Sequence, residues 1–289
     1  MRTMLLFRRT KKLNRSLTVS VLLFALLAVF GAFMALPLIY AVSNAFKPLN
    51  ELFLFPPRFF VTNPTTENFS DLFNLMGNSW IPLSRYITNT LLITVIGTAG
   101  HILLASAAAY PLAKYRFPGS QVLFSIVVLA LMFSGQVTAI PNYIVMSWLG
   151  WINTHASIIV PSLAFPLGLF LMKQFIEQIP DALLEAAKID GANEYQIYWK
   201  IVMPNVKPAW LTLMILQFPA LWGSDGGNFI YSENLKTLHY ALGQISQGGI
   251  ARAGVGAAVA LLLMIVPITL FIISQSSVMQ TMATSGMKE

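Results

Sequence analysis

The sequence predicts an all-α membrane protein with six transmembrane helices and both termini in the cytoplasm. The 289-residue chain is 56% apolar and only 10% charged, and its mean hydropathy is +0.68. A transmembrane helix needs about 20 consecutive, mostly apolar residues. Five long runs of this chain contain no Asp, Glu, Lys or Arg: 16–46, 86–113, 117–172, 208–224 and 253–287.

The charge-free runs are assigned to spans in chain order. The first, second and last runs each hold one span, and 117–172 is long enough for two spans joined by the polar turn GWINTHAS at 150–157. The run from Pro208 is short, but WLTLMILQFPALW at 210–222 is apolar enough for a sixth span. The first apolar stretch exceeds the ~7–15 residues of a signal-peptide core, so we expect a retained anchor.

Basic residues set the expected orientation. With the N-terminus inside, most of the 18 Lys and Arg residues are cytoplasmic, and the external ones are Lys47, Arg58, Arg85, Lys236 and Arg252. An even number of spans returns the C-terminus to the cytoplasm. The net charge of +7 and the pI near 9.7 are therefore explained by membrane topology, and no nucleic-acid partner is expected.

We expect the whole chain, 1–289, to form a single transmembrane domain, because no soluble stretch is long enough to bury a core of its own. Residues 1–15 form a basic cytoplasmic tail. The external segment 47–85 is rich in Pro, Asn and Thr and reads as loop with one short helix. The external segment 223–251 contains several glycines, which suit either a mobile reaching loop or a passive connector.

The chain offers few groups for chemistry. It contains no cysteine, which excludes a disulfide scaffold, and His101, His155 and His239 lack metal-ligand spacing. No phosphate-binding G-x-x-x-x-G-K-[ST] loop occurs, so we expect no catalytic residue, no metal and no bound cofactor. His101, alone within a span, is expected to be a hydrogen-bonded packing residue.

The predicted spans contain no formal charge, which argues against the usual carboxylate of an ion-coupled carrier. Sodium bound by backbone carbonyls remains open. A pathway between such spans would suit a neutral polar solute, although helix packing is the alternative role for each candidate lining residue. These candidates are Asn89, Gln136, Asn142, Tyr143 and Gln217, with Thr90, Ser134 and Ser162 as further polar groups.

The segment 177–207 carries unusual charge for a connector between two apolar spans. Pro180 and Asp181 favour a helix start, and Glu185 and Lys188 are spaced to pair. Gly191 suits the left-handed residue that ends a helix. The sequence therefore predicts one short cytoplasmic helix that ends at a glycine turn.

A second short helix is expected after this turn. Asn193 and Gln196 have capping-box spacing, and Pro204 is expected to stop the helix. A stripe of Tyr195, Tyr198, Trp199 and Val202 would need an apolar surface to rest on. A solvated charged face and a hairpin on the lipid surface are alternatives, but docking of another protein fits the carboxylates and aromatic residues better.

The residues Glu185, Ala186, Ala187, Gly191, Ile201 and Pro204 match the pattern E-A-A-x3-G-x9-I-x-L-P, with Met203 in place of Leu. The segment resembles the EAA loop of membrane subunits of binding-protein-dependent ABC importers. AAYPLAKYRFPGS (108–120) and MFSGQVTAIPNYIVMSWLGWINTHASIIVP (132–161) are similar to carbohydrate permeases of the maltose G-subunit type.

This resemblance implies a permease subunit that forms half of a sugar pathway in a bacterial or archaeal cytoplasmic membrane. It implies a second homologous permease, two ATPase subunits that hold ATP and Mg, an extracytoplasmic sugar-binding protein and membrane lipid as partners. The residues implied to couple to the ATPase are Glu185, Ala186, Ala187, Asp190, Gly191 and Pro204. Those implied to contact the binding protein are Asn228 and Tyr231.

Other functions remain open. The EAA loop is shared by importers of amino acids, phosphate and polyamines. A stand-alone secondary carrier would leave the EAA loop without a purpose, and an integral-membrane enzyme would need a catalytic constellation that the sequence does not contain.

Overall fold

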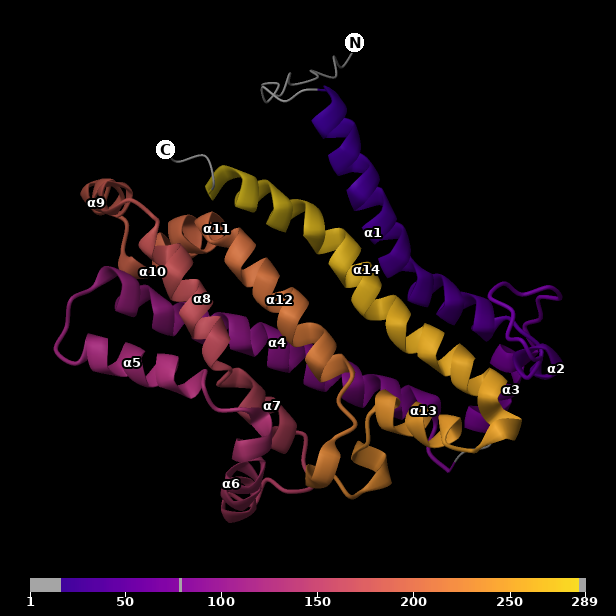
Figure 1. Cartoon of the computed structure of the whole chain (residues 1–289). Coiled ribbons are helices and arrows are strands. Elements are labelled where there is room, and N and C mark those ends of the chain that lie inside the picture. The colour runs from indigo at the N-terminus through magenta and orange to yellow at the C-terminus, as the bar shows by residue number, and fades with distance from the viewer. Residues whose placement is uncertain (1–16, 78–79, 286–289) are drawn as a thin grey trace, which may run out of the picture.

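The protein is described by a computed structural model that covers residues 17–77 and 80–285 (Figure 1). This part of the chain is helical and contains no strand, which confirms the predicted all-α class. The expected basic tail 1–15 lies outside the described residues. The main helices are α1 (Leu17–Ala45), α4 (Leu83–Lys114), α5 (Ser120–Ala130), α6 (Gly135–Trp148), α7 (Ala156–Leu163), α8 (Pro166–Glu177), α12 (Lys207–Trp222) and α14 (Ala253–Ser285).

Several helices are long and apolar enough to cross a membrane. Within the described residues they are α1, α4, the joined helices α7 and α8 (Ala156–Glu177), and Ala253–Gln275 of α14. The span expected in the first half of 117–172 is not one helix, because α5 and α6 meet at 110°. Ser134 adopts an extended backbone, with ψ of 153°, directly before α6 and so breaks the helix. The α12 helix has only 16 residues.

The two segments that the sequence predicts to be external contain more helix than expected. Residues 47–85 form α2 (Leu49–Leu52) and α3 (Glu67–Gly77), where one short helix was expected. Residues 223–251 form the 3-10 turns η2 (Gly227–Phe229) and η3 (Glu233–Leu235) and the helix α13 (Leu238–Ser246). A further 3-10 turn, η4 (Ile250–Arg252), leads into α14. The glycines of this segment serve its turns, since Gly226, Gly227 and Gly249 have positive φ.

The α4 helix lies at the centre of the fold and packs against α7, α8 and α12. Small residues let these helices approach closely: a Cβ added at Gly97 would lie 2.6 Å from Leu221 Cδ1. The side chain of His101 is 1% exposed, and its Nδ1 donates to the Leu163 carbonyl at 3.0 Å. This confirms His101 as a hydrogen-bonded packing residue, and it satisfies a carbonyl at the break between α7 and α8.

The two ends of α4 belong to different hydrophobic clusters. One cluster joins the second half of α4 to α8, α12 and the residues between them, and Met172, Ile176 and Leu213 are fully buried in it. The other joins the start of α4 to α3, α13 and α14. Figure 1 shows α9, α10 and α11 toward the same end as the start of α1 and the end of α14, whereas α6 lies at the opposite end.

Candidate functional site

The charged segment folds into an elbow, by which we mean residues 181–205. Its first helix is α9 (Asp181–Ile189), with Pro180 as N-cap and Asp181 in the first turn. Gly191 then adopts a φ of +81°, as the sequence predicts. Asn193 and Gln196 form the predicted capping box at the start of α10 (Glu194–Ile197), with Asn193 Oδ1 accepting from the Gln196 N–H at 2.8 Å.

The expected stop at Pro204 is wrong, because the helical path continues past it. A π-helical turn, η1 (Tyr198–Val202), and α11 (Met203–Asn205) follow α10, and the break falls at Val206. A proline ring clashes with the carbonyl four residues earlier in a regular helix. The widened turn before Pro204 relieves this clash, and the Met203 N–H bonds to the Tyr198 carbonyl instead.

The expected aromatic stripe is also wrong in part. Tyr195 is 72% exposed and Trp199 is 40% exposed, whereas Ile197 and Val202 are fully buried. Residues five apart share a face in a π turn, and this pairs Ile197 with Val202 rather than continuing the α-helical stripe. The elbow therefore rests on Ile197, on Val202 and on the partly buried Tyr198, as predicted for the last two, and leaves two aromatic rings accessible.

The outer surface of the elbow presents carboxylates. Glu185, Ala186, Asp190 and Gly191 are exposed, and Ala187 is buried beneath them. The spacing-based pair between Glu185 and Lys188 does not form. Lys188 Nζ instead lies 2.7 Å from Glu194 Oε1 across the glycine turn. Within the described residues Glu185 has no ion-pair partner, so its charge is available to another molecule.

The α4 helix fastens the elbow to the helical bundle. Lys114 Nζ donates to the Ile179 carbonyl and pairs with Asp181 Oδ1 at 2.8 Å. The hydroxyls of Ser106 and Tyr198 lie 2.6 Å apart.

Glu194 has one partner on α4, Tyr110, and one on the elbow, Lys188. Tyr110 Oη donates to its Oε2 at 3.1 Å. The hydrogen bond from Lys188 holds the pKa of the Glu194 carboxyl below its usual range, and the same bond raises the pKa of Lys188. The elbow is thus charge-paired internally and to α4.

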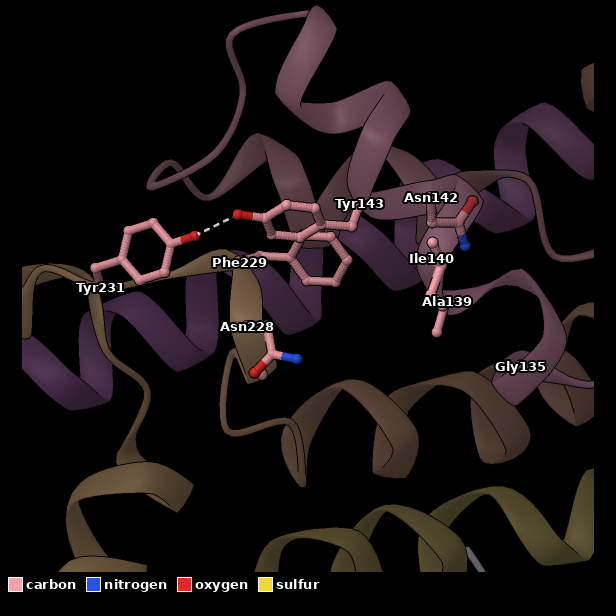
Figure 2. Close-up of a pocket in the computed structure, with 9 residues that line it drawn as sticks. Gly135, Ala139, Ile140, Asn142, Tyr143, Asn228, Phe229 and Tyr231 are labelled. Carbon is pink, nitrogen blue, oxygen red and sulfur yellow. Dashed lines mark hydrogen bonds between the residues drawn. The ribbon is translucent and has the colours of Figure 1, made fainter.

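A second candidate site, the outer pocket, lies between α6 and the segment 227–231, with a volume of about 680 Å³. Figure 2 shows Asn142 and Tyr143 on α6 and Asn228, Phe229 and Tyr231 on the facing segment. The hydroxyls of Tyr143 and Tyr231 are 2.7 Å apart, and the ring centroids of Tyr143 and Phe229 are 6.1 Å apart. The other lining residues are Gly135, Ala139, Ile140 and Gly227.

The sequence predictions did not include Asn153, which joins the turn after α6 to the outer strap, our name for residues 227–238. Its backbone N–H donates to the Phe229 carbonyl at 2.7 Å, and its Oδ1 accepts from the N–H groups of Tyr231 and Ser232 at 3.0 and 2.8 Å. Its Nδ2 donates to Ser232 Oγ at 2.7 Å. The sequence signal that could have found it is an Asn within the polar turn 150–157, since Asn tolerates the left-handed region that Asn153 adopts, with a φ of +63°.

The structure brings together two groups of predicted residues. Asn142 and Tyr143, predicted to line a pathway, and Asn228 and Tyr231, predicted to contact a binding protein, line one pocket.

The other candidate pathway residues lie elsewhere. Asn89 is buried and donates to the carbonyls of Asn234 and Lys236 at 2.8 and 2.9 Å, and Gln217 is buried and donates to the Ser162 carbonyl at 3.2 Å. Gln136 is exposed near the start of α6. These three do not line the outer pocket, and their role in a pathway stays a prediction.

Comparison with known proteins identifies similar sequences over most of this fold. Residues 101–280 match a family described as binding-protein-dependent transport system inner membrane component. Protein LplC of Bacillus subtilis is 32% identical over 66% of this chain, but the match spans only 63% of LplC. The polygalacturonan/rhamnogalacturonan transport system permease protein YtcP of the same species is 32% identical over 70% of this chain and 68% of its own.

A more distant relative and a solved structure agree with these matches. The arabinooligosaccharides transport system permease protein AraQ of Halalkalibacterium halodurans is 29% identical over 72% of both chains. The crystal structure of a bacterial ABC transporter involved in the import of the acidic polysaccharide alginate contains a chain with a TM-score of 0.74 and 22% identity. It covers 90% of this chain and 96% of that chain, and it shows a shared fold.

Proposed function

Because the chain belongs to the family of binding-protein-dependent transport system inner membrane components, we propose that it is a permease subunit of an ATP-driven sugar importer. It forms half of the translocation pathway together with a second, homologous permease. An extracytoplasmic binding protein delivers the sugar, and two ATPase subunits, which hold ATP and Mg, supply the energy. This proposal rests above all on the elbow, whose exposed Glu185 has no ion-pair partner within the described residues.

The elbow is proposed to receive force from an ATPase subunit. Glu185 and Asp190 project a negative surface that suits a basic cleft on the partner, and exposed Tyr195 and Trp199 offer aromatic anchors. The ties from Lys114 and Tyr110 to the elbow favour movement of the elbow and α4 as one unit. A displacement at the cytoplasmic surface would in this way reach the centre of the bundle.

Six membrane crossings are proposed: α1, α4, the bent pair α5 and α6, the joined α7 and α8, α12, and α14. The α12 helix is about 24 Å long at 1.5 Å per residue, somewhat shorter than the ~30 Å hydrocarbon core. Its position between α4 and α14 supports a buried crossing, because protein rather than lipid then surrounds its ends. Figure 1 supports a shared side for the start of α1, the end of α14 and the elbow, which basic residues assign to the cytoplasm.

The substrate class is proposed to be a mono- or oligosaccharide. The relative YtcP is a polygalacturonan/rhamnogalacturonan transport system permease protein, and AraQ is an arabinooligosaccharides transport system permease protein. The outer pocket combines aromatic rings and amides without a charged side chain in its lining, which suits a neutral polar solute.

The substitution Glu185→Lys tests the coupling role. The variant should reach the membrane in normal amounts, but binding of the ATPase subunit should weaken more than tenfold, because like charges then face each other at the interface. Co-purification of the ATPase subunit and ATP-linked sugar uptake in reconstituted vesicles would measure the loss. Glu67→Lys, the same charge change at an exposed position of α3, is the matched control. Normal uptake by the Glu185 variant would refute the proposal.

A further inference from the structure

We propose that the outer pocket binds one ring of an uncharged sugar and that Asn153 is the positioning residue that holds the pocket in its binding shape. This inference rests on the proposed function and deepens it, because it assigns a sugar site to this chain itself. The site lies at the end of the fold opposite the elbow, so a solute would meet it before any ATP-driven movement (Figure 1).

The lining of the pocket matches the two kinds of surface on a sugar ring. The rings of Tyr143, Phe229 and Tyr231 offer electron-rich faces for the C–H groups of a pyranose. The amides of Asn142 and Asn228 each supply a donor and an acceptor for hydroxyl groups. Figure 2 shows Asn142 on α6 and Asn228 on the facing segment, so the two amides come from the two elements that form the pocket.

The volume of the pocket and the absence of charge in its lining limit the class of ligand further. A volume of about 680 Å³ lies within the usual range for small-molecule sites and exceeds that of a single sugar ring. None of the nine lining residues is Asp, Glu, Lys, Arg or His. A uronic acid would therefore bring a carboxylate into a site that offers no countercharge, and its desolvation would oppose binding. The site consequently favours a neutral ring.

Asn153 determines where the aromatic wall stands. Phe229 and Tyr231 belong to the outer strap, and Tyr231 is 58% exposed, so few packing contacts fix its position. Asn153 binds the carbonyl of Phe229 and the N–H groups of Tyr231 and Ser232, which places the strap against α6 before a ligand arrives. Preorganisation of this kind removes the cost of ordering the strap on binding.

The chemistry of Asn153 allows a test of positioning. Asn153→Gly keeps the left-handed backbone but removes all three side-chain hydrogen bonds. Asn153→Asp keeps an oxygen that accepts from both N–H groups, and the Ser232 hydroxyl can donate to its second oxygen. Glycine should therefore weaken sugar binding, and aspartate should restore it. A general stability defect would not be corrected in this selective way.

The assay measures binding of the permease pair to an array of neutral and uronic-acid oligosaccharides. The pair is reconstituted with its ATPase subunits in lipid nanodiscs, and the binding protein is left out. Wild type should bind neutral glycans only. The double variant Asn142→Ala/Asn228→Ala should lower this signal at least tenfold, whereas Trp80→Ala, which removes an exposed aromatic residue outside the pocket, should not change it. Asn153→Gly should lower it about tenfold, and Asn153→Asp should recover most of it.

The sugar site would be refuted if wild type binds no neutral glycan, if it prefers uronic acids, or if the double Asn variant binds neutral glycans as well as wild type. The positioning role of Asn153 would be refuted if Asn153→Gly and Asn153→Asp lose binding equally. The proposed function is tested by a separate measurement, ATP-linked uptake by the Glu185→Lys variant. If that variant is inactive while the double Asn variant binds glycans as wild type does, the importer function stands and only the pocket assignment fails.

Discussion

The glycine turn of the elbow allows a quantitative test, because Gly191 adopts a backbone conformation that residues with a side chain rarely adopt. Gly191 has a φ of +81°, and a Cβ at this position would meet no atom within 4 Å. The Cβ of Gly191→Val therefore meets no neighbour within this chain, and the cost to this chain is the strain of an L-residue in the left-handed region. That strain is about 1–2 kcal/mol, and a β-branched residue belongs at the upper end.

This strain translates into a loss of partner affinity. A penalty of about 2 kcal/mol reduces the ratio of native to relaxed elbow roughly thirtyfold, since about 1.4 kcal/mol is a factor of ten. If the ATPase subunit binds only the native elbow, its apparent affinity falls by up to the same factor. Titration of purified ATPase subunit onto the permease in nanodiscs, followed by biolayer interferometry, measures this affinity.

Two further variants distinguish the effect of backbone strain from the effect of changing a residue in the elbow. Gly119 also has a positive φ, +89°, and open space around a Cβ, but it lies before α5 and outside the elbow. Gly119→Val should carry similar strain and leave the ATPase affinity unchanged. Gly191→Asn should retain most of the affinity, because Asn visits the left-handed region more readily than other residues. Wild-type affinity in Gly191→Val would refute the required left-handed turn.

Three other predictions concern packing, anchoring and pH. Gly168→Ala should lower the thermal unfolding midpoint in detergent, because the new Cβ would lie 1.9 Å from His101 Nε2, and overpacking costs about 1–3 kcal/mol. Asn89→Ala should speed amide exchange in the outer strap, because the buried carbonyl of Lys236 loses its donor at a cost of about 1–3 kcal/mol and that of Asn234 keeps only Arg85. Because Lys188 lowers the pKa of Glu194, their pair stabilises the elbow above the ordinary carboxyl pKa of 4.5 and loses this effect as the pH falls through the lowered value. Amide exchange in α9 and α10, corrected for intrinsic rates, should therefore increase below about pH 4.5.

These three predictions have separate controls. Gly243→Ala, where a Cβ meets nothing within 4 Å, should not lower the unfolding midpoint, and equal midpoints for Gly168→Ala and wild type would contradict the packing argument. Strap exchange that is unaffected by Asn89→Ala would show that other contacts hold the strap. Glu194→Gln should abolish the pH effect, and an unchanged acid response in that variant would assign it to a different carboxyl.

Local features of the elbow could be predicted from the sequence because neighbouring residues encode them. The helix start at Asp181, the left-handed Gly191 and the capping box at Asn193 each depend on residues within four positions. The prediction failed where local rules competed. Pro204 should end a regular helix, but a π turn accommodates its ring, and the same turn places Ile197 beside the predicted Val202 on the buried face.

By itself the sequence determined the helical class, the main apolar segments and the motif that identifies the family, because composition, charge spacing and capping act over short distances along the chain. Only the tertiary structure decided which distant residues meet: Lys114 with Asp181, Asn153 with the outer strap, and Tyr143 with Tyr231. Such pairs depend on how helices pack around α4, and no periodicity records that packing. The outer pocket exists because the chain bends by 110° before α6 and the strap returns to meet it.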